Sequence, residues 1–212
     1  MSASAIEQGS ADWFALRCGK VTASRVADIV AKTKTGPAAS RANYLAQLVA
    51  ERLTGNVAES YSNDAMKWGT EKEPEARAAY EFFERSVVMP VGFVQHPSIE
   101  MSGASPDGLI GDVGLVEIKC PNTATHIETL LGRAVPGKYV TQIQWQLACT
   151  GRAWCDFVSF DPRMPEDMKL FTKRVARDDK VIAELEDAVR LFLAEVSDTV
   201  SRLEKLYRQE AA

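Results

Sequence analysis

The segment Ser105–Pro121, SPDGLIGDVGLVEIKCP, restricts the possible folds more than any other part of the chain. It contains a P-D pair, then a gap of nine residues, then an E-x-K tripeptide. Alternate residues of a β-strand share one face, so Glu117 and Lys119 are expected to point to the same side. A turn at Gly111–Gly114 can fold the preceding strand back and bring Asp107 to that side. The segment therefore predicts a hairpin that carries two carboxylates and one amine to one corner.

These three groups favour a particular chemistry. Two carboxylates that lie close together favour protonation of one of them, unless a cation lies between them. Oxygen ligands alone suit Mg²⁺ or Mn²⁺, which keep several waters and accept substrate phosphates. Lys119 can then orient or deprotonate a metal-bound water, or stabilise the charge that develops on phosphorus. The alternative is a surface ion pair between Glu117 and Lys119 with Asp107 in a loop, which would be the better interpretation of an isolated E-x-K.

The composition is typical of one globular domain. With 212 residues and 46% apolar content, the chain can bury a single core, so we expect one domain over residues 1–212. The net charge of −4 is not that of a general nucleic-acid binder, and phosphate contacts would have to be local. The four cysteines contain no C-x-x-C pair, which favours reduced thiols over a zinc site. Without a signal-peptide core or a long apolar run, a cytoplasmic protein with no membrane contact is expected.

The apolar periodicity predicts a mixed α/β fold with one central sheet. Helices are expected near residues 22–30 and 41–53, within the run 68–85, and near residues 123–131, 138–149 and 178–207. Strands are expected within residues 87–97, 101–110, 114–121, 153–161 and 168–176. Pro74 is tolerated only in the first turn of a helix, so the third helix is expected to begin just before it.

Six short motifs resemble those of a known family. The P-D…E-I-K arrangement is similar to the PD-(D/E)xK nuclease superfamily and, more closely, to the lambda-type alkaline exonucleases of phage recombination, which are YqaJ-like viral recombinases. The motifs LRCGKVTAS, WGTEKEPEAR, SPDGL, EIKCP, QIQWQ and FDPRM follow in the family's order over roughly residues 12–165. The resemblance implies a restriction-endonuclease-like α/β core, with a central mixed β-sheet flanked by helices.

The resemblance also implies an activity. A member of this family would be a Mg²⁺-dependent nuclease, with Mn²⁺ as a substitute, that degrades one strand of linear double-stranded DNA processively from 5′ to 3′. It would form a homotrimer ring around the DNA and pass the 3′ overhang to a single-strand annealing protein, as a phage or prophage product in the bacterial cytoplasm. The alternatives are a RecB-like or restriction-type endonuclease with the same corner, and a non-catalytic ring that binds DNA ends.

The family's metal site falls on the hairpin. Asp107 and Glu117 match the metal-binding acids, and the backbone carbonyl of Ile118 would complete the protein ligands. Lys119 matches the catalytic lysine.

Other elements complete the family's site. Glu73, on a helix, matches a further acid, and Gln144, in QIQ, matches a glutamine near the nucleophile. The family holds the 5′-phosphate of the DNA in a basic pocket, and Arg17, Ser24 and Ser105 match three of its positions. An arginine fork and two hydroxyls suit a terminal phosphate. These matches favour an enzyme that depends on DNA ends.

The fourth position of the phosphate pocket departs from the family. An arginine is expected there, and this chain has Thr125. His126 or Arg133 can take its place as a DNA contact. The resemblance implies two further DNA contacts, which are Lys34 in a basic loop and Met66, whose counterpart is an apolar wedge in the base stack.

Overall fold

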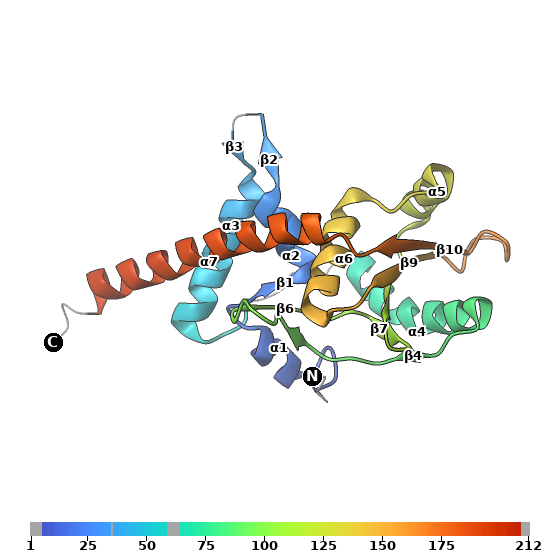
Figure 1. The fold of residues 1–212 in the computed structure, drawn as a ribbon, viewed down its shortest axis with the longest axis horizontal. Coiled ribbons are helices and arrows are strands. Elements are labelled where there is room, and N and C mark those ends of the chain that lie inside the picture. Colours follow the sequence, from blue (N-terminus) through green and yellow to red (C-terminus); the bar gives the residue numbers. More distant parts are fainter. Residues whose placement is uncertain (1–5, 35, 59–63, 209–212) are drawn as a thin grey trace.

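A five-stranded mixed sheet forms the centre of the fold (Figure 1). The computed structural model describes residues 6–34, 36–58 and 64–208, except the side chains of residues 65 and 66. The strands lie in the order β10 (Leu170–Ala176), β9 (Trp154–Phe160), β8 (Gly114–Lys119), β7 (Gly108–Ile110) and β4 (Val88–Met89). β8 and β9 run parallel, whereas the other neighbours pair antiparallel. The expected mixed central sheet is confirmed.

β7 and β8 form the hairpin expected around the acid and lysine motif. Ile110 pairs with Gly114 across the turn. Gly111 in this turn has a φ of 49°, a left-handed conformation that glycine adopts without strain. A Cβ at Gly114 would lie 2.3 Å from the ring of Trp154. Glycine at this position therefore lets β8 pass close to the first residue of β9.

Two smaller sheets accompany the central one in the described part of the chain. One has the order β1 (Val21–Thr22), β6 (Ser102–Ala104) and β5 (Val94–Gln95). The other is the hairpin of β2 (Lys32–Thr33) and β3 (Gly36–Pro37), which projects from the body in Figure 1. The expectation of a single sheet is wrong for residues 87–97, because β4 and β5 belong to different sheets. Pro90 and Gly92 lie between these strands, and both residues interrupt a strand.

Seven helices of the described residues pack around these sheets. They are α1 (Ala11–Arg17), α2 (Ala23–Val30), α3 (Ala39–Thr54), α4 (Asp64–Glu84), α5 (Thr123–Gly132), α6 (Gly137–Thr150) and α7 (Asp179–Tyr207). α4 packs on β8 and β10, whereas α6 packs on β6 and β9. The central sheet is therefore covered on both faces, as a mixed sheet of this kind requires.

Strand alternation sorts the residues of β8 between the two faces. Val116 and Ile118 belong to the apolar cluster that contains Tyr80 of α4. Leu115 belongs to the cluster that contains Ile143 of α6. Because the side-chain period of a strand is two, the odd-numbered residues of β8 face α6. The acid and the lysine of E-x-K are therefore directed to the α6 side.

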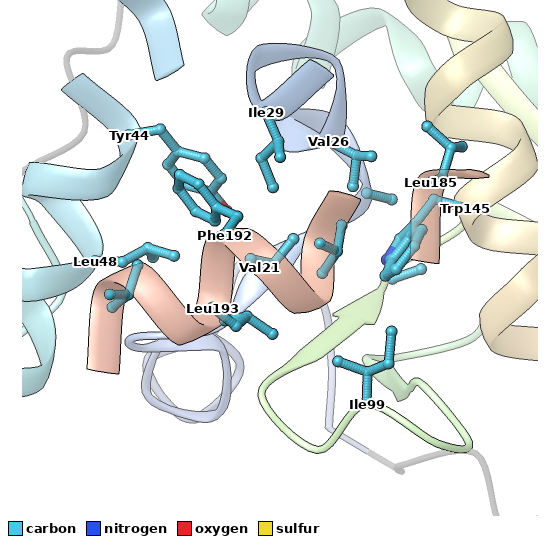
Figure 2. Close-up of a cluster of buried hydrophobic side chains, with 14 of the residues drawn as sticks. Val21, Val26, Ile29, Tyr44, Leu48, Ile99, Trp145, Leu185, Phe192 and Leu193 are labelled. Carbon is cyan, nitrogen blue, oxygen red and sulfur yellow. The ribbon is translucent and has the colours of Figure 1, made fainter. Parts of the chain in front are cut away.

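A second core joins α7 to the N-terminal helices. Figure 2 shows Phe192 beside Tyr44, and Trp145 near Leu185 at the other end of the cluster. The ring centres of Phe192 and Tyr44 are 5.5 Å apart. α7 crosses the molecule, and its last turns extend from the body in Figure 1. Leu203 still packs against this core. The helix thus covers its own domain for most of its length.

The start of α4 differs most from the helix boundaries that were expected. α4 begins at Asp64, so Pro74 lies inside the helix and not in its first turn. Proline in a helix interior removes one backbone hydrogen bond. Trp68, one turn and a half before Pro74, packs against the core cluster under α4. We attribute the early start of α4 to the packing of Trp68, because the rule that places proline in the first turn of a helix does not include tertiary packing.

The four cysteines are free, as expected. Among the described residues, no helix has both the length and the apolar character needed to cross a bilayer.

A buried aspartate ties α4 to the sheet. Asp156 of β9 is 2% exposed and accepts a 2.8 Å hydrogen bond from the Tyr80 hydroxyl. Arg174 of β10 donates two hydrogen bonds of 2.8 Å to the same carboxylate. The Arg174 guanidinium also lies 3.5 Å from the ring centre of Trp154. Asp156, Tyr80 and Arg174 therefore form a hydrogen-bonded cluster on the face of the sheet that α4 covers.

Replacing Asp156 by alanine should lower the free energy of unfolding by about 2–3 kcal/mol, because the buried Tyr80 hydroxyl and the guanidinium lose their acceptor. Urea denaturation measures this change. Asp198→Ala is the control, since its 3.9 Å ion pair with Arg202 is exposed and its loss should change stability by less than about 0.5 kcal/mol. Equal free energies of unfolding for the two variants would contradict a stabilising role of the hydrogen bonds to Asp156.

Candidate active site

The β7–β8 hairpin brings the predicted carboxylates and lysine together. Asp107 directly precedes β7, and its Oδ2 accepts a 2.5 Å hydrogen bond from the backbone N–H of Ile118 in β8. The Lys119 ammonium contacts Oε1 of Glu117. Glu117 is 1% exposed, and the Lys119 side chain is 27% exposed. The alternative of a surface ion pair is therefore wrong, because the acid of this pair lies in the interior.

Two glutamines of α6 hold the buried acid. Nε2 of Gln142 donates to Oε1 of Glu117, and Nε2 of Gln146 donates to Oε2, both at 2.5 Å. The two glutamines are four residues apart and so share one face of the helix. Together with Lys119, they give both carboxylate oxygens a donor.

Gln144 does not take part in this cluster, so its predicted place near the nucleophile is wrong. Its Nε2 donates to the carbonyl of Ala176 at 2.8 Å, and its Oε1 accepts from the N–H of Asp178 at 3.0 Å. A step of two residues turns a helix by roughly 200°, which directs Gln144 away from Glu117. The i, i+4 spacing of the outer glutamines in the QIQWQ motif is the signal that would have selected Gln142 and Gln146.

The two acids and the lysine shift one another's protonation. Burial and the charge of Glu117 raise the pKa of Asp107 well above its usual range, and the charge of Glu73 adds to this effect. Burial by itself would lower the pKa of Lys119, but the carboxylates of Glu117 and Asp107 raise it. Lys119 is therefore a stable ammonium, suited to stabilising negative charge.

Glu73 of α4 lies at the edge of this corner. It lines the same cavity as Asp107, and its Oε1 accepts a 2.8 Å hydrogen bond from Arg77 one turn later. The structure thus places this predicted acid beside the hairpin, whereas its catalytic role remains a prediction.

The corner fits a Mg²⁺ ion by its donor chemistry. No group of three acidic, cysteine or histidine side chains among the described residues could hold a metal by itself. Mg²⁺ does not need such a group, because proteins usually bind it through one or two carboxylates plus waters and substrate phosphates. Asp107 and Glu117 supply two carboxylates on one hairpin, held by the Ile118 N–H and the Gln142 amide, which is the number of acids that such a site uses.

One cavity of about 1240 Å³ is lined both by acids of this corner and by cations near α1 and α2, which form its basic side. Asp107 and Glu73 line one part of it, and Arg17, Lys20 and Ser24 also line it. These residues come from the ends of α1 and α2 and from the segment between them. The cavity therefore joins groups that can bind a metal to groups that can bind a phosphate.

The predicted phosphate-binding residues lie on this basic side. The guanidinium of Arg17 stacks 3.6 Å from the ring centre of Trp13, and its Nε is buried without a partner among the described residues. Burial lowers the pKa of Arg17 to about 10, which leaves it charged at neutral pH. The indole N–H of Trp13 donates to Oγ of Ser105 at 3.0 Å. Ser24 is exposed at the start of α2 and faces the cavity.

The other residues predicted to contact DNA differ in their exposure to solvent. Lys34 is exposed in the turn of the β2–β3 hairpin, and Thr125 is half-buried in the first turn of α5. The side chain of Met66 lies outside the described residues.

His126 cannot replace the missing arginine, so that prediction is wrong. The residue is fully buried, with Nδ1 2.8 Å from Oγ of Ser159 and Nε2 2.8 Å from the carbonyl of Met168. The helical spacing turns His126 inward while Thr125 stays near the surface. Both ring nitrogens of His126 are engaged in hydrogen bonds within the protein and are not available to DNA.

A mixed sheet that presents P-D and E-x-K on one hairpin, with helices on both faces, defines the PD-(D/E)xK nuclease fold. The chain belongs to the YqaJ-like viral recombinase family, whose model matches residues 12–153. The resemblance to this family is therefore confirmed.

Solved structures of similar chains agree with this assignment. LHK-Exo in complex with dAMP is 52% identical, with a TM-score of 0.89 over 94% of this chain and 99% of that chain. A second structure of this alkaline exonuclease, from Laribacter hongkongensis, has the same identity and coverage and a TM-score of 0.88. A phage-related exonuclease from Haemophilus somnus 129PT is 15% identical, with a TM-score of 0.70 over 87% of this chain and 96% of that chain, and it shows the fold alone. No curated protein matches the chain significantly. These likenesses support a nuclease.

Replacing Asp107 by asparagine should stabilise the metal-free protein at pH 8, because it removes a carboxylate that burial and Glu117 disfavour. A raised pKa in the folded state means that stability falls as pH rises from the unfolded pKa of about 3.9 through the folded pKa. The gain should therefore be largest in alkaline buffer and vanish near pH 4. Thermal unfolding in a chelator measures it, and a variant less stable than the wild type at pH 8 would contradict the assignment.

Proposed function

We propose that the protein is a metal-dependent exonuclease that degrades one strand of linear double-stranded DNA from its 5′ end. The observation that carries this proposal is the single cavity that joins Asp107, of the carboxylate and lysine corner, to Arg17, of the basic side. An arginine with an unpartnered buried Nε has the chemistry to bind a terminal phosphate. An enzyme that anchors a 5′ end and cleaves nearby acts on ends and not within the duplex.

The residues of the corner divide the work of phosphodiester hydrolysis. Mg²⁺, held when bound by Asp107, Glu117 and the carbonyl of Ile118, would supply a Lewis acid and an activated water. The Lys119 ammonium lies beside Glu117 and stabilises the charge that develops on the phosphoryl oxygens. The N–H of Ile118 orients Asp107, and the Gln142 amide orients Glu117. Glu73 adds a negative charge at the cavity side of the corner.

The basic side would bind the 5′-phosphate. Arg17 supplies the fork, Ser24 supplies a hydroxyl, and Ser105 holds Trp13 on which Arg17 stacks. The Lys20 ammonium adds a second cation to this part of the cavity. LHK-Exo, whose structure contains dAMP, is a nucleotide-binding relative at 52% identity. Thr125, by contrast, contributes no charge, so the preference for a phosphorylated end should be moderate.

The assembly and the partner follow from the family likeness alone. We infer a homotrimer ring around the DNA, whose topology would give processive digestion although the net charge is −4. Lys34 on the projecting hairpin and Met66 would contact the duplex. The 3′ overhang would pass to a single-strand annealing protein, in the bacterial host of a phage or prophage.

With Mg²⁺ present, the wild-type protein should digest 5′-labelled linear duplex and leave closed circular duplex intact, as seen on a gel. Lys119→Ala should lower the rate at least about 100-fold while DNA binding stays near the wild-type level, since the lysine acts mainly on the transition state. Light scattering of the same sample tests the trimer mass. Cleavage of the circle would favour an endonuclease, and binding without cleavage by the wild type would favour a non-catalytic ring.

Removal of the 5′-phosphate from the substrate should slow digestion, because Arg17 then has no ligand. Arg17→Ala should slow the phosphorylated substrate by about 10-fold, consistent with the loss of one charge-assisted contact. The dephosphorylated substrate should be digested by wild type and variant at similar rates in single-turnover assays. An equal loss on both substrates would show that Arg17 serves folding and not end recognition.

A further inference from the structure

The two oxygens of Glu117 have different surroundings. Oε1 receives the Lys119 ammonium, whose side chain is 27% exposed, and the amide of half-buried Gln142. Oε2 receives the amide of Gln146, which is fully buried. The carboxylate is therefore held with one oxygen outward and one oxygen inward.

Gln146 is an unusual residue for its position. Its Nε2 donates to Glu117, but its Oε1 is buried without a hydrogen-bond partner among the described residues. An unpartnered buried carbonyl is unfavourable, and an apolar side chain of the same length would avoid this cost. Its neighbours Trp145 and Leu147 on α6 belong to the apolar cores. The buried amide therefore has a use only through its bond to Glu117.

We propose that Gln146 is a positioning residue that sets the metal preference of the site, an inference that rests on the proposed function. By holding the inner oxygen of Glu117, it stops the carboxylate from turning both oxygens toward a metal ion bound at the corner. Mg²⁺ demands near-ideal octahedral geometry, whereas Ca²⁺ accepts two oxygens of one carboxylate. A carboxylate held with one oxygen outward thus favours Mg²⁺ over Ca²⁺.

α6 offers a matched control for this proposal. Gln144 is the same residue type, lies on the same helix and is also buried, but it bonds to the backbone of Ala176 and Asp178. Gln144→Met removes two hydrogen bonds that are unrelated to Glu117. Gln146→Met removes the one bond to Glu117 and keeps the volume of the side chain.

The test measures metal binding without DNA or cleavage. Mn²⁺ is titrated into the metal-free full-length protein, free Mn²⁺ is followed by electron paramagnetic resonance, and Mg²⁺ and Ca²⁺ are added as competitors. Gln146→Met should weaken Mg²⁺ binding by about 10-fold or more, as is usual for a residue that orients a metal ligand. The affinity for Ca²⁺ should change less, so the ratio of the Mg²⁺ affinity to the Ca²⁺ affinity should fall. Gln144→Met should keep both affinities even where its melting temperature falls.

A cooperative thermal unfolding transition shows that each variant is folded. If Gln146→Met does not fold, Gln146→Asn takes its place, because the asparagine side chain keeps an amide but is too short to reach Glu117. Wild-type affinities and an unchanged Mg²⁺/Ca²⁺ ratio in a folded Gln146 variant would overturn the inference alone. Absence of Mn²⁺ binding by the wild type would overturn the metal-dependent function itself and the inference with it.

Discussion

The need to compensate a buried carboxylate organises this protein. Glu117 is 1% exposed on a central strand, and a charge in that position is tolerated only with close donors. Lys119 supplies the opposite charge, and two amides of α6 supply the hydrogen bonds. The parallel pairing of β8 with β9 and the packing of α6 on β9 hold these groups in place. The same contacts thus support the sheet and shape the site.

One cavity links the acidic corner to the cations of the proposed function. Asp107 of the hairpin and Glu73 of α4 line the same cavity as Arg17 of α1 and Lys20 of the segment before α2. A chain with a net charge of −4 can still bind a polyanion when its cations are concentrated in this way. In the proposed function, the residues assigned to the metal and those assigned to the 5′-phosphate can act on one substrate because both groups line the same cavity.

Most of the fold could be predicted from periodicity and turn residues. The hairpin around Gly111 was predictable because a glycine turn and strand alternation are local properties. The start of α4 was not, because the proline rule does not include the packing of Trp68 on the core ahead of Pro74. The division of residues 87–97 between two sheets was not predictable either, since strand partners are chosen by contacts distant in sequence.

The sequence by itself determined the corner that carries the two acids and the lysine. Asp107, Glu117 and Lys119 lie within one hairpin, and the period of a strand is enough to direct the last two to one side. Only the tertiary structure decided which glutamines of α6 meet Glu117, and that His126 turns into the interior. A sequence motif does not say which face of its helix is turned toward the sheet. In the structure, the face of α6 that carries Gln142 and Gln146 meets Glu117, whereas Gln144 lies on another face. The orientation of this face follows from the packing of α6 on β9, a contact between segments that are separate in the chain.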